Sequence, residues 1–382
     1  MIHVPTIRAF LDERHLDLAV RIDDFTRESL APLPEPADDA AARVQAREVL
    51  ALLGEADWYA PILAQDLRAL CLIRESVAAA SPLADAVYAL QALGSTPILL
   101  AGSEDLREGW LPAVARGEAM AAFAMTEPEA GSDVASMKTT ARREGDGWVL
   151  DGVKTFISNA GIADFYTVFA STNPERGHKG ISCFIVPGDA DGLVFEGPQV
   201  LSAPHPLGTI RFDACRVPAG SIVGEEGEGF KLGLATLDRL RATVAAAACG
   251  MAGRALDEAL DHARERKQFG KPLAEFQLVQ QKLARMATDL AAARLLTYRA
   301  AWEKDGGAER VTVEAAMAKA FATEAAQRII DDAVQILGGR GVLAEHPVDR
   351  LYRSIRALRI YEGTTEIQHL VIAGRLIEAE RD

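Results

Sequence analysis

The sequence predicts an α+β protein in which two helical regions flank a middle β region. Ala and Leu recur at spacings of three and four up to about residue 120 and again after Gly229, as in amphipathic helices. Between these regions, short β-branched and aromatic runs alternate with Gly, Asp and Pro, which is typical of strands and turns. We therefore expect an N-terminal α-helical domain (1–120), a middle antiparallel β domain (121–228) and a C-terminal four-helix-bundle domain (229–382).

Helical periodicity in the N-terminal region is clearest from Arg43 to Leu53 and from Leu83 to Leu93. Proline lacks an amide hydrogen and glycine lowers helix propensity, so both residue types are expected to interrupt helices. The residues expected to do so here are Pro32, Pro34, Pro36, Gly94, Pro97, Gly102 and Gly109.

Strands in the middle region are expected at 165–170, 181–186 and 210–212, where β-branched and aromatic residues cluster. Two dipeptides, Asp146-Gly147 and Asp151-Gly152, are typical of turns because both positions tolerate a positive φ. They predict an antiparallel hairpin within residues 139–157.

The C-terminal region contains four helical segments that are longer than a typical globular helix. Segments of this length, separated by short breaks, predict a four-helix bundle. The segments are 230–265, 274–303, 311–336 and 364–380.

Charge and cysteine content narrow the possible partners and the compartment. The chain carries 41 basic and 55 acidic residues, a net charge of -14, which argues against a general affinity for nucleic acid or anionic membranes. An anionic ligand therefore needs a local basic site. The four cysteines form no CxxC pair and have no histidine at metal-ligand spacing, so no disulfide framework and no metal site are expected. A reducing cytoplasm fits this pattern best.

The N-terminus and the hydropathy pattern argue for a soluble protein. The first 25 residues carry several acidic side chains, the wrong charge for a signal or transit peptide. We find no uninterrupted apolar run of the roughly 18 residues that a membrane-spanning helix needs.

Nucleotide-binding loops of the common kinds are not found, because no G-x-G-x-x-G follows a predicted strand and no G-x-x-x-x-G-K-[ST] is present. The candidates for chemistry are instead blocks rich in small, hydroxyl and charged residues. They lie at 123–133, 264–270, 335–341 and 360–368.

Each block permits an ordinary structural interpretation. The 126–133 segment can hold a polar heterocycle or a phosphate through its hydroxyls and N–H groups, or it can be an Asx-type turn. Arg264, Arg266 and Lys267 can grip a diphosphate or complement the dipole at a helix end. The glycines at 338–341 are typical of a helix C-cap.

Glu362 lies between Tyr361 and Gly363, just ahead of the helix that Thr364 opens. Its carboxylate can complement the helix N-terminus. It can also be a base that abstracts a proton next to a carbonyl, since apolar neighbours raise the pKa of a carboxyl group. The residues themselves leave both interpretations open.

Taken together, the blocks resemble the acyl-CoA dehydrogenase family over residues 40–380. Five blocks occur in the order found in that family, which is far more specific than any one of them. They are AFAMTEPEAGSD (122–133), RVPAGSIVGEEGEGF (216–230), ERKQFGKPL (265–273), DAVQILGGRGV (332–342) and YEGTTEIQ (361–368).

The resemblance implies a catalytic role for Glu362. In that family, the carboxylate at this position takes the α-proton of an acyl-CoA thioester while a hydride passes from Cβ to N5 of FAD. Some relatives place the base instead just before the residue that matches Arg241. That position is Leu240 here, which cannot serve.

The resemblance also implies cofactor and substrate contacts. Thr126, Phe156 and Ser158 would lie against the isoalloxazine, and Thr364 and Glu366 would hold FAD within the same chain. The residues that would bind the diphosphate and adenosine of a FAD held mainly by the neighbouring subunit are Arg266, Phe269, Gln335 and Gly339. The residues that would contact the acyl-CoA are Ser132, Asp238, Arg241, Tyr361 and Gly363.

Some positions depart from the family pattern. Phe156 replaces the usual Trp and Ser158 a common Thr. In the 201–212 segment, His205 and Pro206 replace the usual Arg and Ser-Asp, which puts the CoA contacts of that segment in doubt.

The implied function is the FAD-dependent α,β-dehydrogenation of an acyl-CoA to the trans-2-enoyl-CoA, with electrons passed to an electron-transfer flavoprotein. A homo-oligomer, a dimer or a dimer of dimers, is implied as well. The alternatives are an oxygen-using oxidase or flavin monooxygenase of the same fold, and a flavin-free helical interaction module. The acyl group itself is set by pocket shape, which the sequence does not reveal.

Overall fold

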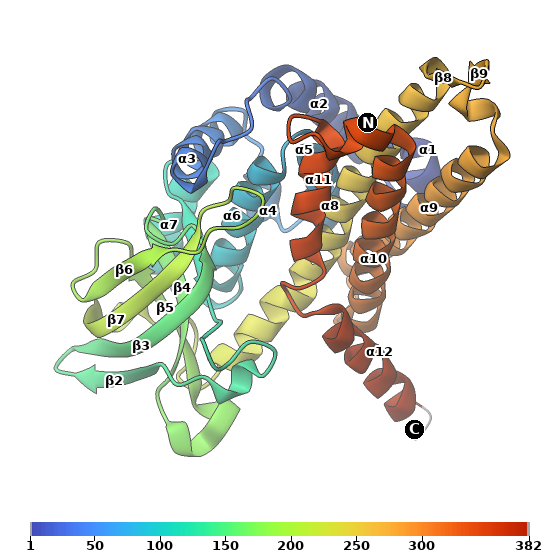
Figure 1. Cartoon of the computed structure of the whole chain (residues 1–382). Helices are drawn as coiled ribbons and strands as arrows, with labels where there is room; N and C mark the ends of the chain where they lie inside the picture. Colours follow the sequence, from blue (N-terminus) through green and yellow to red (C-terminus); the bar gives the residue numbers. More distant parts are fainter. Residues whose placement is uncertain (1, 380–382) are drawn as a thin grey trace. The chain divides into compact units, whose positions relative to one another are not determined.

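The structure, a computed structural model, describes residues 2–379. Residue 1 of the predicted N-terminal domain and residues 380–382 of the predicted C-terminal domain lie outside it. Its contacts group the chain into two compact units, and Figure 1 labels the helices and strands. Unit 1 combines the segment up to Leu33, Asp66–Asp85 and the chain from Asp238 on. Unit 2 combines Pro34–Gln65 and Ala86–Leu237. The N-terminal helices are thus shared between the two units.

Unit 1 is helical. The long segments predicted at the C-terminus are present as α8 (Gly229–Glu265), α9 (Gln277–Asp305), α10 (Thr312–Leu337) and α12 (Thr365–Ala379). The sequence analysis did not predict α11 (Pro347–Leu358). The remaining elements are α1 (Val4–Ile7), α2 (Glu13–Phe25), α5 (Leu67–Ala80) and the small hairpin of β8 (Lys267–Gln268) and β9 (Lys271–Pro272).

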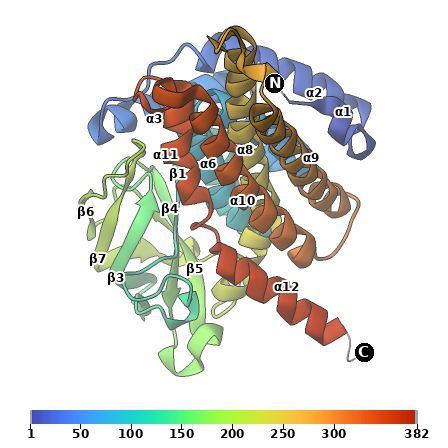
Figure 2. The ribbon, with the colours of Figure 1, turned by 45° about the vertical axis from the view of Figure 1, so that its right-hand side comes forward.

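Helix α10 is the central element of the C-terminal helices. It packs against α9, α11 and α12, and Figure 2 shows α9, α10 and α11 running alongside one another. Most of its buried side chains are alanines, which let neighbouring backbones approach closely. Lys319 and Asp332 are charged residues that are nevertheless buried in this helix.

Unit 2 contains a seven-stranded sheet with helices α3 (Asp39–Glu55), α4 (Ala60–Ala64), most of α6 (Pro82–Ala101) and α7 (Glu104–Ala115). The strands follow the order β1-β4-β2-β3-β7-β6, with β5 paired to β4. The pairing is mostly antiparallel, as predicted, but β1 and β2 both run parallel to β4. The strands are β1 (Ala121–Ala124), β2 (Thr140–Glu144), β3 (Gly147–Ser158), β4 (Phe165–Ser171), β5 (Ile181–Pro187), β6 (Leu193–Pro198) and β7 (Leu207–Pro218).

The predicted hairpin is confirmed as the antiparallel pair β2 and β3, but Asp151-Gly152 is not a turn. This dipeptide lies inside β3, where the register with β7 shifts between Leu150 and Gly152. Gly152 has φ +149°, and a Cβ there would meet the Thr139 hydroxyl at 2.5 Å. The glycine therefore marks a bulge and a close approach.

The expected interruptions at Gly94, Pro97 and Gly109 are also wrong, because Gly94 and Pro97 lie inside α6 and Gly109 lies inside α7. A Cβ on Gly94 would come within 2.6 Å of the Cβ of Ala121, so the glycine permits close packing of the helix on β1. The hydroxyl of Thr167 donates to the carbonyl of Gly94 at 2.7 Å. Among the described residues, α6 alone is long and apolar enough to cross a membrane, but 83% of its apolar window is buried, as in the core helix of a globular protein.

A glycine in α8 provides a test of the helix packing in unit 1. A Cβ on Gly250 would lie 1.9 Å from the carbonyl oxygen of Glu75 in α5. Gly250→Ala should therefore lower the free energy of unfolding by about 1–3 kcal/mol, the usual cost of overpacking, measured by urea denaturation. Gly374→Ala in α12 is the matched control, because no atom lies within 4 Å of its added methyl group. Equal denaturation midpoints for the two variants would contradict the packing described.

Candidate active site

Glu362 occupies a strained backbone corner between α11 and α12. Its φ is +53°, in the left-handed region that non-glycine residues seldom adopt, and Gly363 follows with φ +90°. Glycine is favoured at position 363 because L side chains rarely adopt this φ, and a Cβ there would also lie 2.4 Å from Nε2 of Gln368. As predicted, α12 begins directly after the corner, and the hydroxyl of Thr364 accepts a hydrogen bond from the N–H of Ile367. Strain of this kind is concentrated at functional sites.

The carboxylate of Glu362 is only partly satisfied by the protein. Its Oε2 atom is buried and has no hydrogen-bond partner within residues 2–379. Burial raises the pKa of Glu362, while the nearby charges of Arg74, Arg241 and Lys319 oppose that rise. A buried, unpaired carboxylate oxygen is costly unless a ligand uses it. This side chain therefore has the properties of a general base.

One of the cations near Glu362 is held by a buried ion pair. Arg74 in α5 is 2% exposed, and its Nε and Nη2 each lie 2.8 Å from a carboxylate oxygen of Asp85. Its Nη1 donates to the hydroxyl of Thr243 at 2.9 Å. The bidentate geometry fixes the guanidinium in place. Sequence analysis did not single out this pair.

The predicted substrate contacts Asp238 and Arg241 lie together in α8. Nη1 of Arg241 is 2.5 Å from one carboxylate oxygen of Asp238, and the hydroxyl of Thr312 donates to the other at 2.7 Å. Nε of Arg241 is buried and has no partner in the part of the chain that the structure describes. Leu240, which precedes Arg241, is buried.

The predicted contacts Tyr361 and Gly363 flank Glu362 in sequence and share its corner, whereas Ser132 lies elsewhere. Tyr361 is 38% exposed. Ser132 is exposed in the loop after β1 in unit 2. Four of the five predicted substrate residues therefore lie in unit 1, and the fifth, Ser132, lies in unit 2.

In unit 2, the loop that carries Thr126 is anchored by a buried ion pair. Nζ of Lys154, which is fully buried, lies 2.8 Å from a carboxylate oxygen of Glu127 and 3.1 Å from the carbonyl of Met125. Burial lowers the pKa of Lys154 to about 8. Burial alone would raise the pKa of Glu127, but Lys154 and the N–H of Lys138 hold it below its ordinary value. The N–H of Thr155 binds the carbonyl of Thr126 at 3.0 Å, which ties the loop to β3.

The end of β3 brings Phe156 and Ser158 against the segment that departs from the family pattern. Oγ of Ser158 lies 2.7 Å from Nε2 of His205. Burial lowers the pKa of His205 to about 4, so this imidazole is neutral at pH 7. Phe156 has φ +55° and is 61% exposed, and its N–H donates to Oε1 of Gln199 at 2.8 Å. The ring of Phe156 is therefore presented outward on a fixed backbone.

The residues predicted to hold a neighbour's FAD gather at one end of unit 1. Phe269 in the β8–β9 turn has φ +51° and is 94% exposed. The guanidinium of Arg266 is exposed and has no side-chain partner among the residues described. Burial lowers the pKa of His262, and the charges of Arg340 and Arg266 lower it further. Gln335 and Gly339 are exposed at that same end.

Thr364 and Glu366 lie at the opposite end of α10. Lys319 in this helix donates to the carbonyl of Gly363, whereas Gln335 follows 16 residues later, or about 24 Å along the axis. Figure 1 shows the β8–β9 hairpin beyond one end of α10 and α12 beside the other. Within one chain, the predicted FAD contacts of unit 1 therefore form two separate groups.

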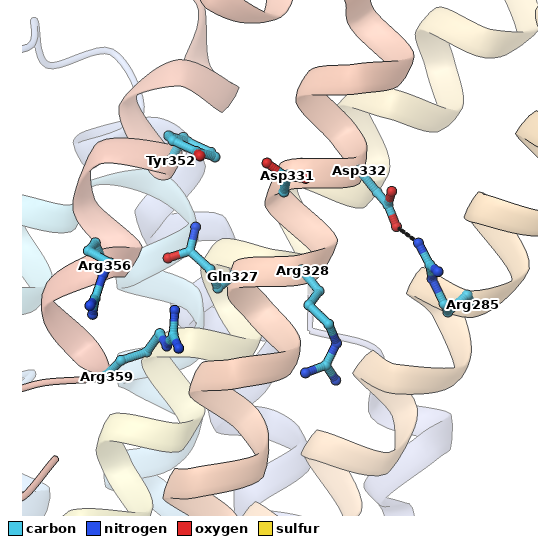
Figure 3. Close-up of a pocket in the computed structure, with 8 residues that line it drawn as sticks. All are labelled: Arg285, Gln327, Arg328, Asp331, Asp332, Tyr352, Arg356 and Arg359. Atoms are coloured by element: carbon cyan, nitrogen blue, oxygen red, sulfur yellow. Dashed lines mark hydrogen bonds and ion pairs between the residues drawn. The ribbon is translucent and has the colours of Figure 1, made fainter. Parts of the chain in front are cut away.

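A pocket of about 470 Å³ is formed by α9, α10 and α11 (Figure 3). Three of its four arginines are engaged in ion pairs: Arg285 with Asp332, Arg328 with Asp289 and Arg359 with Glu324. It contains none of the predicted site residues. The lining residues are Arg285, Gln327, Arg328, Asp331, Asp332, Tyr352, Arg356 and Arg359.

No group of three potential metal ligands occurs within residues 2–379. The four cysteines are free and buried. Burial raises the pKa of each of these thiols, in the case of Cys215 to about 12.

Several buried charged residues, near Glu362 in unit 1 or near Thr126 in unit 2, were not predicted from the sequence. Lys319, Arg74 and Lys154 are buried, each within a run of small or apolar residues. A lone charge at a position where helical or strand periodicity predicts the core was the available signal. Such a residue needs a partner, and the partner cannot be identified from the sequence alone.

Three family models match consecutive parts of the chain. The N-terminal domain of acyl-CoA dehydrogenase matches residues 12–118, the middle domain 122–215 and the C-terminal domain 227–377. The fold and these matches define an oxidoreductase of the flavoprotein class. The chain belongs to the acyl-CoA dehydrogenase family, whose members depend on FAD.

Individual relatives agree with this assignment. The chain is 39% identical over 377 residues to a probable acyl-CoA dehydrogenase of Mycobacterium leprae, fadE25, with 96% of each chain covered. It is 46% identical over 287 residues to the human mitochondrial short-chain specific acyl-CoA dehydrogenase, covering 75% of this chain and 69% of that protein.

Two solved structures share the fold. Butyryl-CoA dehydrogenase from Megasphaera elsdenii has a TM-score of 0.90 and 34% identity, with 96% of this chain and 99% of that chain covered. A chain from a structure of the electron transferring flavoprotein of Acidaminococcus fermentans has a TM-score of 0.91 and 34% identity, with 96% and 98% covered. The expected fold class, with helical terminal regions and a middle β region, is confirmed.

The residues present suit FAD. A diphosphate needs a cation that no carboxylate already occupies, and the exposed guanidinium of Arg266 meets this need. An aromatic ring held outward on a left-handed backbone, as in Phe269, offers a flat apolar surface for a nucleotide.

The buried pair of Lys154 and Glu127 gives a direct test of what anchors the Thr126 loop. Lys154→Met should lower the free energy of unfolding by about 3–5 kcal/mol, because it leaves Glu127 as an uncompensated buried charge. Urea denaturation of the FAD-free protein, followed by tryptophan fluorescence, measures the loss. The double variant Lys154→Met/Glu127→Gln should recover part of it. As a control, Arg116→Met breaks an exposed ion pair with Glu118 and should leave the midpoint unchanged. A double variant no more stable than Lys154→Met alone would argue against this account.

Proposed function

We propose that the chain is an acyl-CoA dehydrogenase in which Glu362 is the catalytic base and the product is the trans-2-enoyl-CoA. The observation that carries the proposal is the buried, unpaired Oε2 of Glu362 on a strained corner next to a glycine with positive φ. The carboxylate is costly to the folded protein unless it meets a substrate. The chain belongs to the acyl-CoA dehydrogenase family, and the abstraction of an α-proton from an acyl-CoA is a step for which such a base is suited.

In the proposed reaction, Oε2 of Glu362 takes the α-proton while the Cβ–H electron pair leaves as hydride, and the α,β double bond forms. FAD, when bound, supplies the hydride acceptor. Burial makes Glu362 more basic, and the positive charges of Arg74, Arg241 and Lys319 limit the rise of its pKa. The N–H of Glu362 has no acceptor within the described chain and can donate to the thioester oxygen, where negative charge develops.

We further propose that Thr126, Phe156 and Ser158 contact the isoalloxazine and that Thr364 and Glu366 hold FAD in the same chain. Arg266, Phe269, Gln335 and Gly339 would then bind the diphosphate and adenosine of a FAD held by another subunit. The separation of the two groups along α10 supports this division. The acyl-CoA would be contacted by Ser132, Asp238, Arg241, Tyr361 and Gly363.

The proposed assembly is a homo-oligomer, a dimer or a dimer of dimers, in the cytoplasm. The proposed electron acceptor is an electron-transfer flavoprotein, which the likeness to a chain in an electron transferring flavoprotein structure supports. The proposed domain division at 1–120, 121–228 and 229–382 follows the three family matches more closely than the two contact units.

The role of Glu362 is tested by Glu362→Gln, which keeps the shape of the side chain but removes the base. The variant should retain FAD and bind acyl-CoA but lose roughly 10²-fold or more in the rate of flavin reduction. Anaerobic mixing with a panel of acyl-CoAs, followed by bleaching of the flavin absorbance, measures this rate. Glu118→Gln, at an exposed ion pair in unit 2, should reduce at the wild-type rate. Near-normal reduction in Glu362→Gln would remove Glu362 from the mechanism.

The division of the FAD contacts is tested by Arg266→Ala. The variant should lose FAD more readily, and free FAD should shift it back towards the oligomer, because a ligand bound across an interface stabilises that interface. Size-exclusion chromatography with light scattering, with and without FAD, measures both effects. Arg264→Ala is the matched control on the same helix end, where Arg264 already pairs with Asp261. A monomer that binds FAD as tightly as the wild-type oligomer would show that one chain completes the site.

A further inference from the structure

A second feature of the Glu362 corner is the buried lysine that holds it. Nζ of Lys319 donates to the carbonyl oxygen of Gly363 at 2.6 Å. Lys319 is fully buried in the N-terminal third of α10, where the neighbouring core positions are alanines. A buried ammonium is retained in a packed helix only when it is paired or hydrogen-bonded.

We propose that Lys319 is a positioning residue for Glu362, in that its ammonium fixes the backbone corner from which the catalytic carboxylate projects. The proposal rests on the proposed role of Glu362 as the base. It adds a residue that does not touch the reacting atoms and acts through the base.

The corner is held from two sides. Lys319 reaches the carbonyl of Gly363 from α10, and Nε2 of Gln368 reaches the same carbonyl from α12 at 3.0 Å. Nε2 of Gln368 also lies 3.3 Å from the carbonyl of Glu362, and this glutamine is fully buried. Two buried donors on two helices thus hold two consecutive peptide units with positive φ. Backbone strain of this kind persists only where the surroundings determine it.

The same ammonium belongs to the set of charges that face the carboxylate. Arg74, Arg241 and Lys319, from α5, α8 and α10, favour the ionised form of Glu362, while Asp85 from α6 opposes it. The phenol of Tyr361 is the remaining titratable group beside it. Arg74 and Arg241 each pair with an aspartate, whereas the one hydrogen bond recorded for the Lys319 ammonium is to a neutral carbonyl. Removing the Lys319 charge should therefore act strongly on Glu362.

Lys319 is also the member of this set that can change its charge near neutral pH. Burial lowers the pKa of Lys319 to about 8, while Glu362, Glu324 and Glu366 raise it and Arg241 lowers it. Below that pH the ammonium is charged and lowers the pKa of Glu362. Above it the amine is neutral, and the carboxylate loses this stabilisation.

The test measures the pKa of Glu362 directly, in protein labelled with ¹³C at the glutamate carboxyls and assigned by Glu362→Gln. Lys319→Met keeps the apolar stem but removes the charge and the donor, and should raise the pKa of Glu362 by about 1 or more. The acidic limb of the pH profile of flavin reduction should move upward by the same amount. FAD content should stay at the wild-type level.

Lys304→Met is the matched control, because Nζ of Lys304 also donates to two backbone carbonyls, those of Ala308 and Glu309, at the end of α9. It should leave the pKa of Glu362 and the pH profile unchanged. An unchanged pKa in Lys319→Met, or an equal change in Lys304→Met, would overturn the proposal.

If Lys319→Met fails to fold, the proposal can still be tested by a pH titration of the unmutated protein. The ¹³C resonance of Glu362 should show a second, smaller step at the pKa of Lys319, read independently from the ¹⁵N resonance of its ammonium. The absence of that step would overturn the proposal. The failure of Glu362 as the base would appear differently, as rapid flavin reduction in Glu362→Gln, and would leave these titrations interpretable.

Discussion

The buried polar groups of unit 1 are arranged around one carboxylate, that of Glu362. Burial raises the pKa of Glu362, and three helices each contribute one cation that opposes the rise. Each cation in turn needs its own partner inside the helical core: Asp85 for Arg74, Asp238 for Arg241 and the carbonyl of Gly363 for Lys319. The charged residues of α5, α6, α8 and α10 near Glu362 are therefore linked, since each cation acts on Glu362 and has its own hydrogen-bond or ion-pair partner.

This constraint limits what substitutions the helices tolerate. Replacing both members of a buried pair with apolar residues is often neutral for stability, whereas removing one member leaves an uncompensated charge. Near Glu362, the charges also influence the ionisation of the carboxylate. Substitutions that preserve the fold can therefore still change the pKa of Glu362. The effect of a substitution on stability is thus a poor guide to its effect on the proposed base.

Much of the architecture was predictable because it rests on local patterns. The long C-terminal helices follow from periodicity, and the hairpin of β2 and β3 follows from its strand and turn residues. The errors occurred where distant residues override a local signal. From the sequence, Gly94 was expected to interrupt a helix and Gly152 to form a turn. Each is instead a glycine inside a helix or strand that another backbone or side chain approaches closely.

The candidate site was predictable only in part, for the same reason. Glu362 and its glycine are adjacent in sequence, so the corner could be proposed from a short motif. Lys319 lies 44 residues from its acceptor, and Arg74 lies 11 residues from Asp85 on another helix. Pairings of this kind depend on how helices pack. The two groups of predicted FAD contacts likewise became distinct only when α10 placed them at its opposite ends.

The four buried thiols have a practical consequence for experiments on this protein. Because burial raises the pKa of every one of them, thiolate forms only at strongly alkaline pH, and access of reagents is limited as well. A cysteine introduced on the surface would then be the site that reacts first with maleimide or spin-label reagents. Fluorescent or paramagnetic probes could be attached at chosen positions without replacing any natural cysteine. Such probes would report distances within the otherwise unaltered chain.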